Sequence, residues 1–230
     1  MRVALFDFCN TLVDFSTADS YIRYILEHLD VSEREKRTRK HRILRKLHII
    51  QAHDLLVSRK ILKDVVYLNK RVFLECIKGL TESDLDDFGK AYYTERVKPH
   101  LVKETVSELK RRKTEGYRIA IVSGGYDFYL KYFADEFGVE DLICTRIEIG
   151  KGKATGKIAG TDCMDARKVR LLDDYYKGID VDRSNSYAYS DSRSDLPMLL
   201  WVGNGVVVAR RMEPQWAKKN GLRCMVWQGS

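Results

Sequence analysis

The sequence is poor in proline and cysteine and contains no long hydrophobic run. Three of its 230 residues are proline and five are cysteine. The cysteines are odd in number, widely spaced and never form a C-x-x-C pair. This argues against a disulfide framework or a zinc knuckle and favours a reducing compartment. Apolar runs such as 198–202 and 206–209 reach four or five residues, far below a membrane span. The apolar run before Asp7 is too short for a secretory signal, so we expect a cytoplasmic protein.

Positive charge is concentrated in one stretch of the chain. Lys and Arg outnumber Asp and Glu by 41 to 33, a net charge of +8. Residues 33–46 carry eight basic residues and two acidic ones, so the rest of the chain is close to neutral. The segment has no interleaved aromatic residues for stacking on bases, which disfavours nucleic acid as a partner. We interpret it either as a solvated helix face or as a contact for an anionic partner or an anionic membrane surface.

Short apolar runs that alternate with helical patterns predict an α/β fold with a Rossmann-like parallel sheet. Five runs have the length and composition of buried strands: 3–6, 119–122, 142–145, 186–190 and 206–209. Helical spacing of apolar residues predicts helices at 102–115, 126–137 and 165–176, the second of them ending at a Gly138 C-cap. The glycines within 147–158 predict a β-hairpin.

A helical block interrupts this alternation after the first strand. From 17 to 96 the apolar residues recur at three- and four-residue spacings, without proline and without a β-rich run. Thr81 and Asp84 supply the capping residues of a helix over about 82–95. We therefore predict an α/β core domain of residues 1–15 and 96–230, with an inserted all-helical domain of residues 16–95.

Polar side chains follow three of the predicted strands at the point where each strand ends. They are Asp7, Ser123 and Asp191. Since ligands of open parallel sheets bind at the carboxyl edge of the strands, we expect these side chains to meet in one crevice. Lys168, near the start of a predicted helix, could bring a cation to the same edge.

Four segments, in this order, resemble the motifs of the haloacid dehalogenase (HAD) superfamily. Residues 6–12, Phe-Asp-Phe-Cys-Asn-Thr-Leu, resemble its first motif, D-x-D-G-T-L, and residues 122–126 resemble the second. Lys168 matches the third motif, and Asp191 with Asp195 matches the D-x-x-x-D of the fourth. Residues 155–160 followed by Cys163 are similar to the phosphoserine-phosphatase-like subclass, whose four-helix cap the insertion also resembles.

The resemblance implies a Mg²⁺-dependent phosphatase that hydrolyses a small phosphorylated metabolite. Asp7 would be the nucleophile that forms an aspartyl-phosphate. The expected Mg²⁺ ligands are Asp7, Asp191 and the backbone carbonyl of Cys9, with Asp195 as a ligand or as support for one. The residues expected to bind the phosphate are Asn10 with its neighbouring backbone amides, Ser123, Gly124 and Lys168.

The first motif departs from the family at two positions. Cys9 stands where the family has its general acid/base aspartate, and Asn10 replaces the usual glycine. A neutral thiol activates water poorly, and the loss of acid/base catalysis costs about 10²–10⁴ in rate. Asp14, just beyond the motif, is the first alternative acid/base. Two other functions therefore stay open for this fold: a phosphotransferase, and a catalytically weak phosphoester-binding protein.

Overall fold

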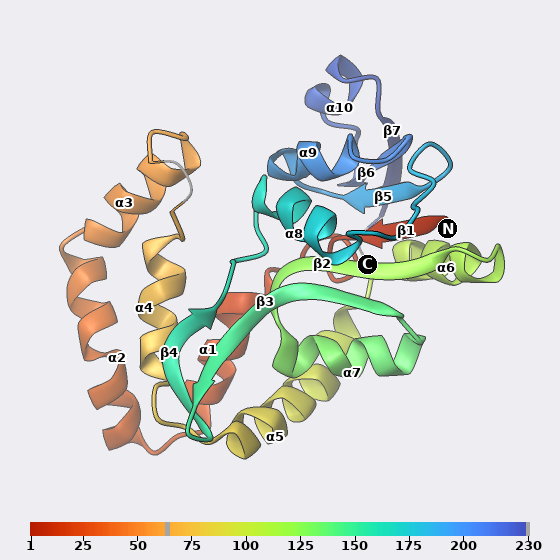
Figure 1. Cartoon of the computed structure of the whole chain (residues 1–230). Helices are drawn as coiled ribbons and strands as arrows, with labels where there is room; N and C mark the ends of the chain where they lie inside the picture. The colour runs from red at the N-terminus through yellow and green to blue at the C-terminus, as the bar shows by residue number, and fades with distance from the viewer. Residues whose placement is uncertain (63–64, 229–230) are drawn as a thin grey trace.

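A seven-stranded sheet in the order β4-β3-β2-β1-β5-β6-β7 forms the centre of the protein (Figure 1). The structure is a computed structural model that describes residues 1–62 and 65–228. Within this part of the chain, only the pairing of β3 with β4 is antiparallel. The strands are β1 (Val3–Phe6), β2 (Arg118–Tyr126), β3 (Asp141–Gly150), β4 (Lys153–Ala159), β5 (Tyr187–Ser190), β6 (Asn204–Arg210) and β7 (Arg223–Trp227).

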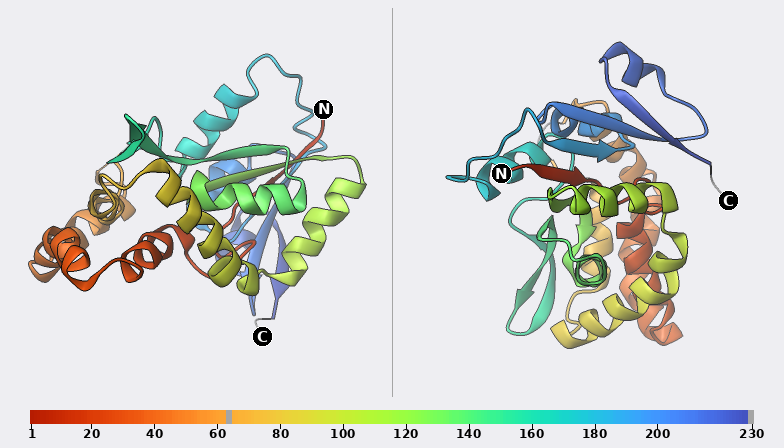
Figure 2. Two further views of the ribbon diagram at one scale, coloured as in Figure 1. Left: turned by 90° about the horizontal axis from the view of Figure 1, so that it is seen from below. Right: turned by 90° about the vertical axis from the view of Figure 1, so that its right-hand side faces the viewer.

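The central strand β1 is buried on both faces. Ala4 and Phe6 belong to an apolar cluster with α6 (Lys103–Thr114) and α7 (Asp127–Phe137) on one side of the sheet. Val3 and Leu5 belong to a second cluster on the other side, with α8 (Arg167–Tyr175), α9 (Leu196–Leu199) and α10 (Gln215–Lys219). Because successive side chains of a strand point to opposite faces, β1 contributes apolar contacts to the helices on both sides of the sheet (Figures 1 and 2).

The chain between β1 and β2 is helical, as the sequence predicts. Its elements are α1 (Thr17–Glu27), α2 (Val31–Lys46), α3 (Ile49–Ser58), α4 (Leu68–Cys76), α5 (Glu82–Tyr92), a π-helical turn (Tyr93–Val97) and a 3₁₀ turn (Lys98–His100). Thr81 and Asp84, the predicted capping residues, form a reciprocal capping box at the start of α5. In the described residues, no helix is long and apolar enough to cross a membrane.

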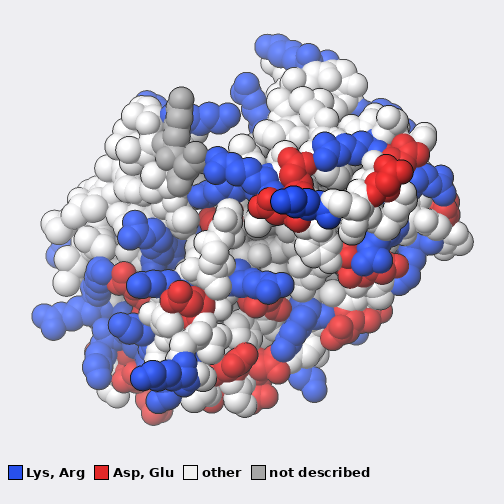
Figure 3. Space-filling view, in the orientation of Figure 1, with Lys and Arg blue, Asp and Glu red and all other residues white. Residues whose placement is uncertain are grey.

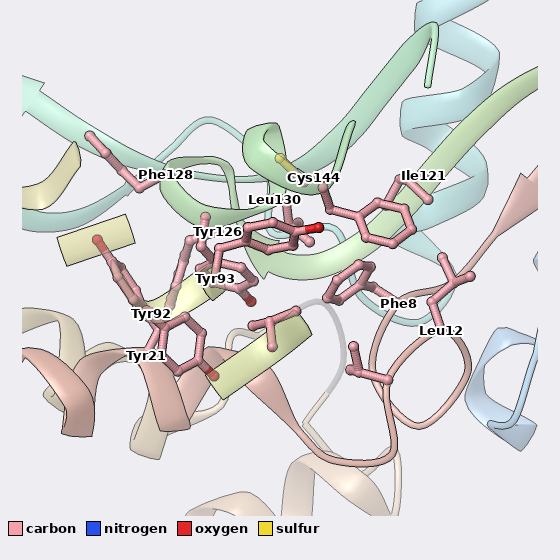
Figure 4. Packing of buried hydrophobic residues seen from close by; sticks show 14 of the residues in the cluster. Phe8, Leu12, Tyr21, Tyr92, Tyr93, Ile121, Tyr126, Phe128, Leu130 and Cys144 are labelled. Atoms are coloured by element: carbon pink, nitrogen blue, oxygen red, sulfur yellow. The ribbon is translucent and has the colours of Figure 1, made fainter. Parts of the chain in front are cut away.

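One apolar core runs through both the helical insertion and the sheet. Tyr21 of α1 and Tyr92 of α5 pack against Tyr129 of α7, with ring centroids 5.2 Å from it. The rings of Tyr21 and Tyr92 also contact each other, with centroids 5.4 Å apart (Figure 4). The ring centroid of Tyr126, at the end of β2, lies 6.2 Å from that of Tyr21. Side-chain packing is therefore continuous across the domain boundaries predicted at 15/16 and 95/96. The division into two domains stays a prediction. Residues 63–64 and 229–230 of the proposed domains lie outside the described residues.

Several predicted elements are longer or shorter in the structure. β3 combines the strand predicted at 142–145 with the first arm of the predicted hairpin. The turn that follows it contains Lys151 and Gly152, with φ of 51° and 72°. The helix predicted from 165 begins at Arg167, because Asp165 adopts a left-handed φ of 53°. β7 is not among the predicted strands, because its five residues are too few to show a clear alternation of apolar and polar side chains. Gly138 is the left-handed C-cap of α7, as predicted.

The contact between α5 and α7 yields a stability prediction. A Cβ added at Gly89 would overlap the Phe128 carbonyl oxygen. Helix propensity alone predicts that Gly89→Ala stabilises the protein by roughly 1 kcal/mol. We expect the opposite, a loss of about 1–3 kcal/mol, because the overlap forces the helices apart. Urea denaturation of Gly89→Ala beside Lys90→Ala, an exposed control in the same helix, measures the sign. A stabilised Gly89→Ala would show that the two helices separate at little cost.

Candidate active site

A cavity of about 380 Å³ lies at the carboxyl edge of the sheet, between the core and the helical insertion. All of the side chains predicted for the site line it. They are Asp7 and its neighbours Cys9 and Asn10, Ser123 and Gly124 of β2, Lys168 of α8, and Asp191 and Asp195 after β5. Segments from four parts of the sequence thus meet here, as expected for strand ends of a parallel sheet.

A buried ammonium group joins two of these carboxylates. Lys168 Nζ donates hydrogen bonds to Asp7 Oδ1 at 2.7 Å and to Asp195 Oδ2 at 2.6 Å. Ser190 Oγ also donates to Asp195 Oδ2, at 2.7 Å. Burial alone would lower the pKa of Lys168, but the Asp195 and Asp7 carboxylates outweigh it and raise that pKa. Lys168 therefore stays charged and fixes the direction of the Asp7 carboxylate.

Asp191 faces Asp7, and among the described residues no salt bridge joins its carboxylate to a cation, unlike those of Asp7 and Asp195. The Thr11 hydroxyl lies 3.4 Å from Asp7 Oδ2 and 3.3 Å from Asp191 Oδ1, so one threonine bridges the two carboxylates. Burial, reinforced by Asp7 and Asp195, raises the pKa of Asp191 to about 7. Burial raises the pKa of Asp7 to about 6, although Lys168 opposes this. Three carboxylates share one ammonium group, so the site has an excess of negative charge.

Cys9 is held by the first turn of α1. The Thr17 backbone N–H donates to Cys9 Sγ at 3.3 Å, and the Thr17 hydroxyl lies 3.0 Å from the same sulfur. That hydroxyl also lies 2.6 Å from the Tyr129 hydroxyl. Burial and the nearby Asp7 raise the pKa of the thiol. Cys9 is thus a neutral thiol next to the nucleophile position.

The second departure from the first motif has a backbone explanation. Asn10 adopts a φ of 53°, in the left-handed region that glycine favours. Asparagine is one of the few other residues that enter this region readily. The substitution therefore keeps the turn that carries the backbone amides after Asp7.

The glycine turn at the end of β2 lies on the other side of the cavity. Ser123 Oγ accepts a hydrogen bond from the Gly125 N–H at 3.1 Å. A Cβ on Gly124 would lie 2.7 Å from Met164 Cγ, so only glycine fits under the Met164 side chain. Ser123 and Gly124 nevertheless line the cavity.

The insertion contributes side chains that the sequence analysis did not identify. Lys70 of α4 is buried and donates to the Gly124 carbonyl at 2.7 Å and to Asp162 Oδ1 at 2.5 Å. Asn69 donates to Asp19 Oδ2 at 2.5 Å, and both line the cavity. A lysine on an apolar helix face resembles a surface residue in sequence, so no local pattern distinguished Lys70.

Asp14, the predicted alternative acid/base, lies outside the lining of this cavity. Its carboxylate contacts His100 Nδ1 at 3.0 Å on an exposed surface. It also lines a separate depression beside Trp216 and Trp227. The position of Asp14 therefore does not support the acid/base role considered for it.

The donor set fits Mg²⁺ as a partly hydrated ion. Among the described residues no cluster of three His, Cys, Asp or Glu side chains forms a ready-made cage, and one oxygen each of Asp7 and Asp195 is engaged by Lys168. Mg²⁺ typically uses one or two carboxylates and completes its shell with waters and substrate phosphate. The facing oxygens of Asp7 and Asp191, and the excess negative charge, meet that requirement.

The haloacid dehalogenase-like hydrolase model matches residues 4–200, most of the chain. The chain belongs to this family. The predicted family is thereby confirmed, and the α/β fold with it. A phosphoserine phosphatase of Methanocaldococcus jannaschii is 28% identical over 88% of this chain and 82% of its own length. A histidinol-phosphatase of Neisseria meningitidis is 23% identical over 90% of each chain.

Solved structures show the same fold. A phospho-aspartyl intermediate analogue of phosphoserine phosphatase superimposes with a TM-score of 0.61 at 22% identity, over 97% of this chain and 92% of that one. A Bordetella pertussis protein of unknown function gives 0.73 at 22% identity, over 97% of both chains. The likeness to the phosphoserine phosphatases predicted from sequence is thus borne out along nearly the whole chain.

The raised pKa of Asp191 predicts how stability changes with pH. A carboxyl group with a higher pKa in the folded than in the unfolded chain binds protons more tightly when folded. The contribution of Asp191 to stability therefore falls as the pH rises from about 4 to about 7. In metal-free buffer at pH 8, we expect Asp191→Asn to be more stable than wild type by at least roughly 1 kcal/mol, with a smaller difference at pH 5.

Urea denaturation at both pH values measures this difference. The exposed Asp87→Asn variant is the control and should show no such widening. If wild type is as stable as Asp191→Asn at pH 8, the carboxylate excess is neutralised by another group.

Proposed function

We propose that the protein is a Mg²⁺-dependent phosphomonoester hydrolase that acts through an aspartyl-phosphate on Asp7. The observation that carries the proposal is the Asp7 carboxylate. Lys168 fixes one of its oxygens, and Asp191 faces the other across Thr11. Ser123 and the Gly124 turn stand opposite, in the same cavity. The similarity to phosphoserine phosphatases over most of the chain supports the same reaction class.

In the first step an Asp7 oxygen attacks phosphorus, and the bond from phosphorus to the ester oxygen breaks. The leaving oxygen takes the bond electrons and is protonated by water, because the Cys9 thiol with its raised pKa is a weak acid. Lys168, the Ser123 hydroxyl and the backbone amides near Asn10, which line the same cavity, would bind the phosphate oxygens as their charge develops. Asp7 and Asp191 would hold Mg²⁺, which neutralises phosphate charge and aligns the phosphate with the nucleophile. Asp195 positions Lys168 through their hydrogen bond.

In the second step water attacks the phosphorus of the aspartyl-phosphate, and Asp7 leaves as a carboxylate. The attacking water must lose a proton, which inorganic phosphate or a base takes up. Cys9, a thiol with a raised pKa, serves this step poorly. We therefore propose slow hydrolysis with water, and two alternatives remain. The phosphoryl group passes to another acceptor, or the cavity binds phosphoesters with little turnover.

The cavity volume of about 380 Å³ suits a small phosphorylated metabolite. O-phosphoserine and histidinol phosphate, the substrates that the names of the two relatives suggest, are the first two members of a test panel. All five cysteines are free. This supports the proposed cytoplasmic location.

The role of Asp7 is tested by Asp7→Asn. An amide cannot form the acyl-phosphate, so we expect turnover to fall by roughly 10³-fold or more while the melting temperature is retained or raised. Acid quenching during turnover, followed by intact mass measurement, should detect phosphoprotein in wild type and not in the variant. Asp14→Asn is the matched control, since Asp14 lies outside the cavity, and should keep wild-type rates. An Asp7→Asn variant within tenfold of wild type would remove Asp7 as the nucleophile.

The role of Cys9 is tested by Cys9→Asp. A carboxylate there can accept hydrogen bonds from the Thr17 N–H and hydroxyl, which already contact the sulfur. Its negative charge would also lie beside the N-terminus of α1, the positive end of the helix dipole. We expect phosphate release from p-nitrophenyl phosphate to rise at least roughly tenfold. Cys9→Ser, neutral and of similar size, should give no rise.

The same assay separates the alternatives. If wild type hydrolyses briskly and Cys9→Asp is no faster, another group is the acid/base. A wild type that is slow with water and fast with an added alcohol favours the phosphotransferase. Inactivity of both proteins on every phosphomonoester favours the binding protein.

A further inference from the structure

A second hollow, of about 750 Å³, lies in the helical insertion away from the catalytic cavity. It is a groove between α1 and α2, which both pack against α4. Its floor is formed by the buried side chains of Leu26, His41 and Phe73. Its walls are formed by long side chains of α1 and α2. We call it the α1–α2 groove.

The walls of the α1–α2 groove are strongly cationic. Five Arg and Lys side chains line it, against Glu27 and Glu35: Arg23, Arg34, Arg42, Arg45 and Lys46. In residues 1–62 and 65–228, the salt bridges made by α2 side chains join Arg37 to Glu33 and Lys40 to Glu75, outside the groove. Arg34, Arg45 and Lys46 thus face the groove without a carboxylate partner there. Like charges held together in a concave site attract anions.

The floor restricts the kind of anion that fits. The His41 ring packs against Phe73 at a tilt of 33°, with centroids 4.2 Å apart, and the Arg23 guanidinium lies 5.1 Å from the centroid of the Phe73 ring. The aromatic surface is therefore already covered, and a flat base gains little by stacking there. The guanidinium groups of the walls instead match phosphate oxygens, which arginine binds through paired hydrogen bonds.

The α1–α2 groove is recessed between the helices, whereas the outer face of α2 is exposed to solvent. Lys and Arg gather over α2 in the view of Figure 3, and Lys36 and Arg39 belong to the exposed part of this helix without lining the groove. A flat membrane surface contacts such an outer face. A compact anion can instead enter between the helices and meet charges from both walls at once.

We propose that the α1–α2 groove is a binding site for a compact polyphosphate anion, either inorganic polyphosphate or the phosphate chain of a nucleoside triphosphate. The site is distinct from the catalytic cavity and does not depend on the proposed reaction. It assigns a ligand class to the basic segment 33–46, whose charge the hydrolase proposal leaves unused.

The test measures sodium triphosphate binding by calorimetry, in metal-free buffer at low salt and without substrate. The groove variant is Arg34→Gln with Arg45→Gln. The matched control is Lys36→Gln with Arg39→Gln, which removes the same charge from the same helix outside the groove. We expect one triphosphate per chain for wild type, at least tenfold weaker binding by the groove variant, and less than a threefold change in the control.

Each other outcome overturns the proposal. If both double variants lose affinity equally, the overall charge of the helix attracts anions, and binding of both to anionic vesicles would then identify a membrane-facing surface. If neither loses affinity, triphosphate binds elsewhere. ATP should bind within about threefold of triphosphate, and a preference above tenfold would show that the base is recognised and the covered floor is accessible. Melting temperatures of both variants in the absence of ligand verify that they are folded.

Discussion

The buried ammonium of Lys168 between Asp7 and Asp195 is the interaction on which the site depends. A buried charge is tolerated only when it is paired and hydrogen-bonded, so the end of β1, the start of α8 and the turn after β5 must meet at one point. The same pairing leaves Asp191 without a cation. The ammonium group that orients Asp7, the proposed nucleophile, and the excess of negative charge that favours the proposed Mg²⁺ are therefore two results of one arrangement.

The sequence predicted the parts of this site that follow from strand geometry. Asp7, Ser123 and Asp191 each come directly after a buried strand, and the parallel sheet brings such positions to one edge whatever lies between them. Lys70 could not be predicted in this way. Its partners, the Gly124 carbonyl and Asp162, are set by how α4 packs against the core, and that packing has no local pattern.

Cys9 shows the same division between local and tertiary information. Its position in the first motif shows that the acid/base carboxylate usual in the family is absent here. Its surroundings, with Thr17 on the sulfur and Tyr129 on Thr17, depend on how α1 meets α7. The tyrosine packing that holds α1 and α5 against the core also limits how far these two helices can swing as a lid.

The position of β1 in the sheet also has a consequence during synthesis. β1 is the first strand to be made, yet it lies between β2 and β5, and its register pairs it with residues 118–121 and 187–189. The four apolar residues of β1 therefore stay unpaired until β2 and β5 have been synthesised. The helical insertion is translated before either strand. Such long-range pairing slows folding and prolongs the exposure of aggregation-prone surface. A nascent chain shorter than about 190 residues therefore exposes one unpaired edge of its central strand, because β5 has not yet been made.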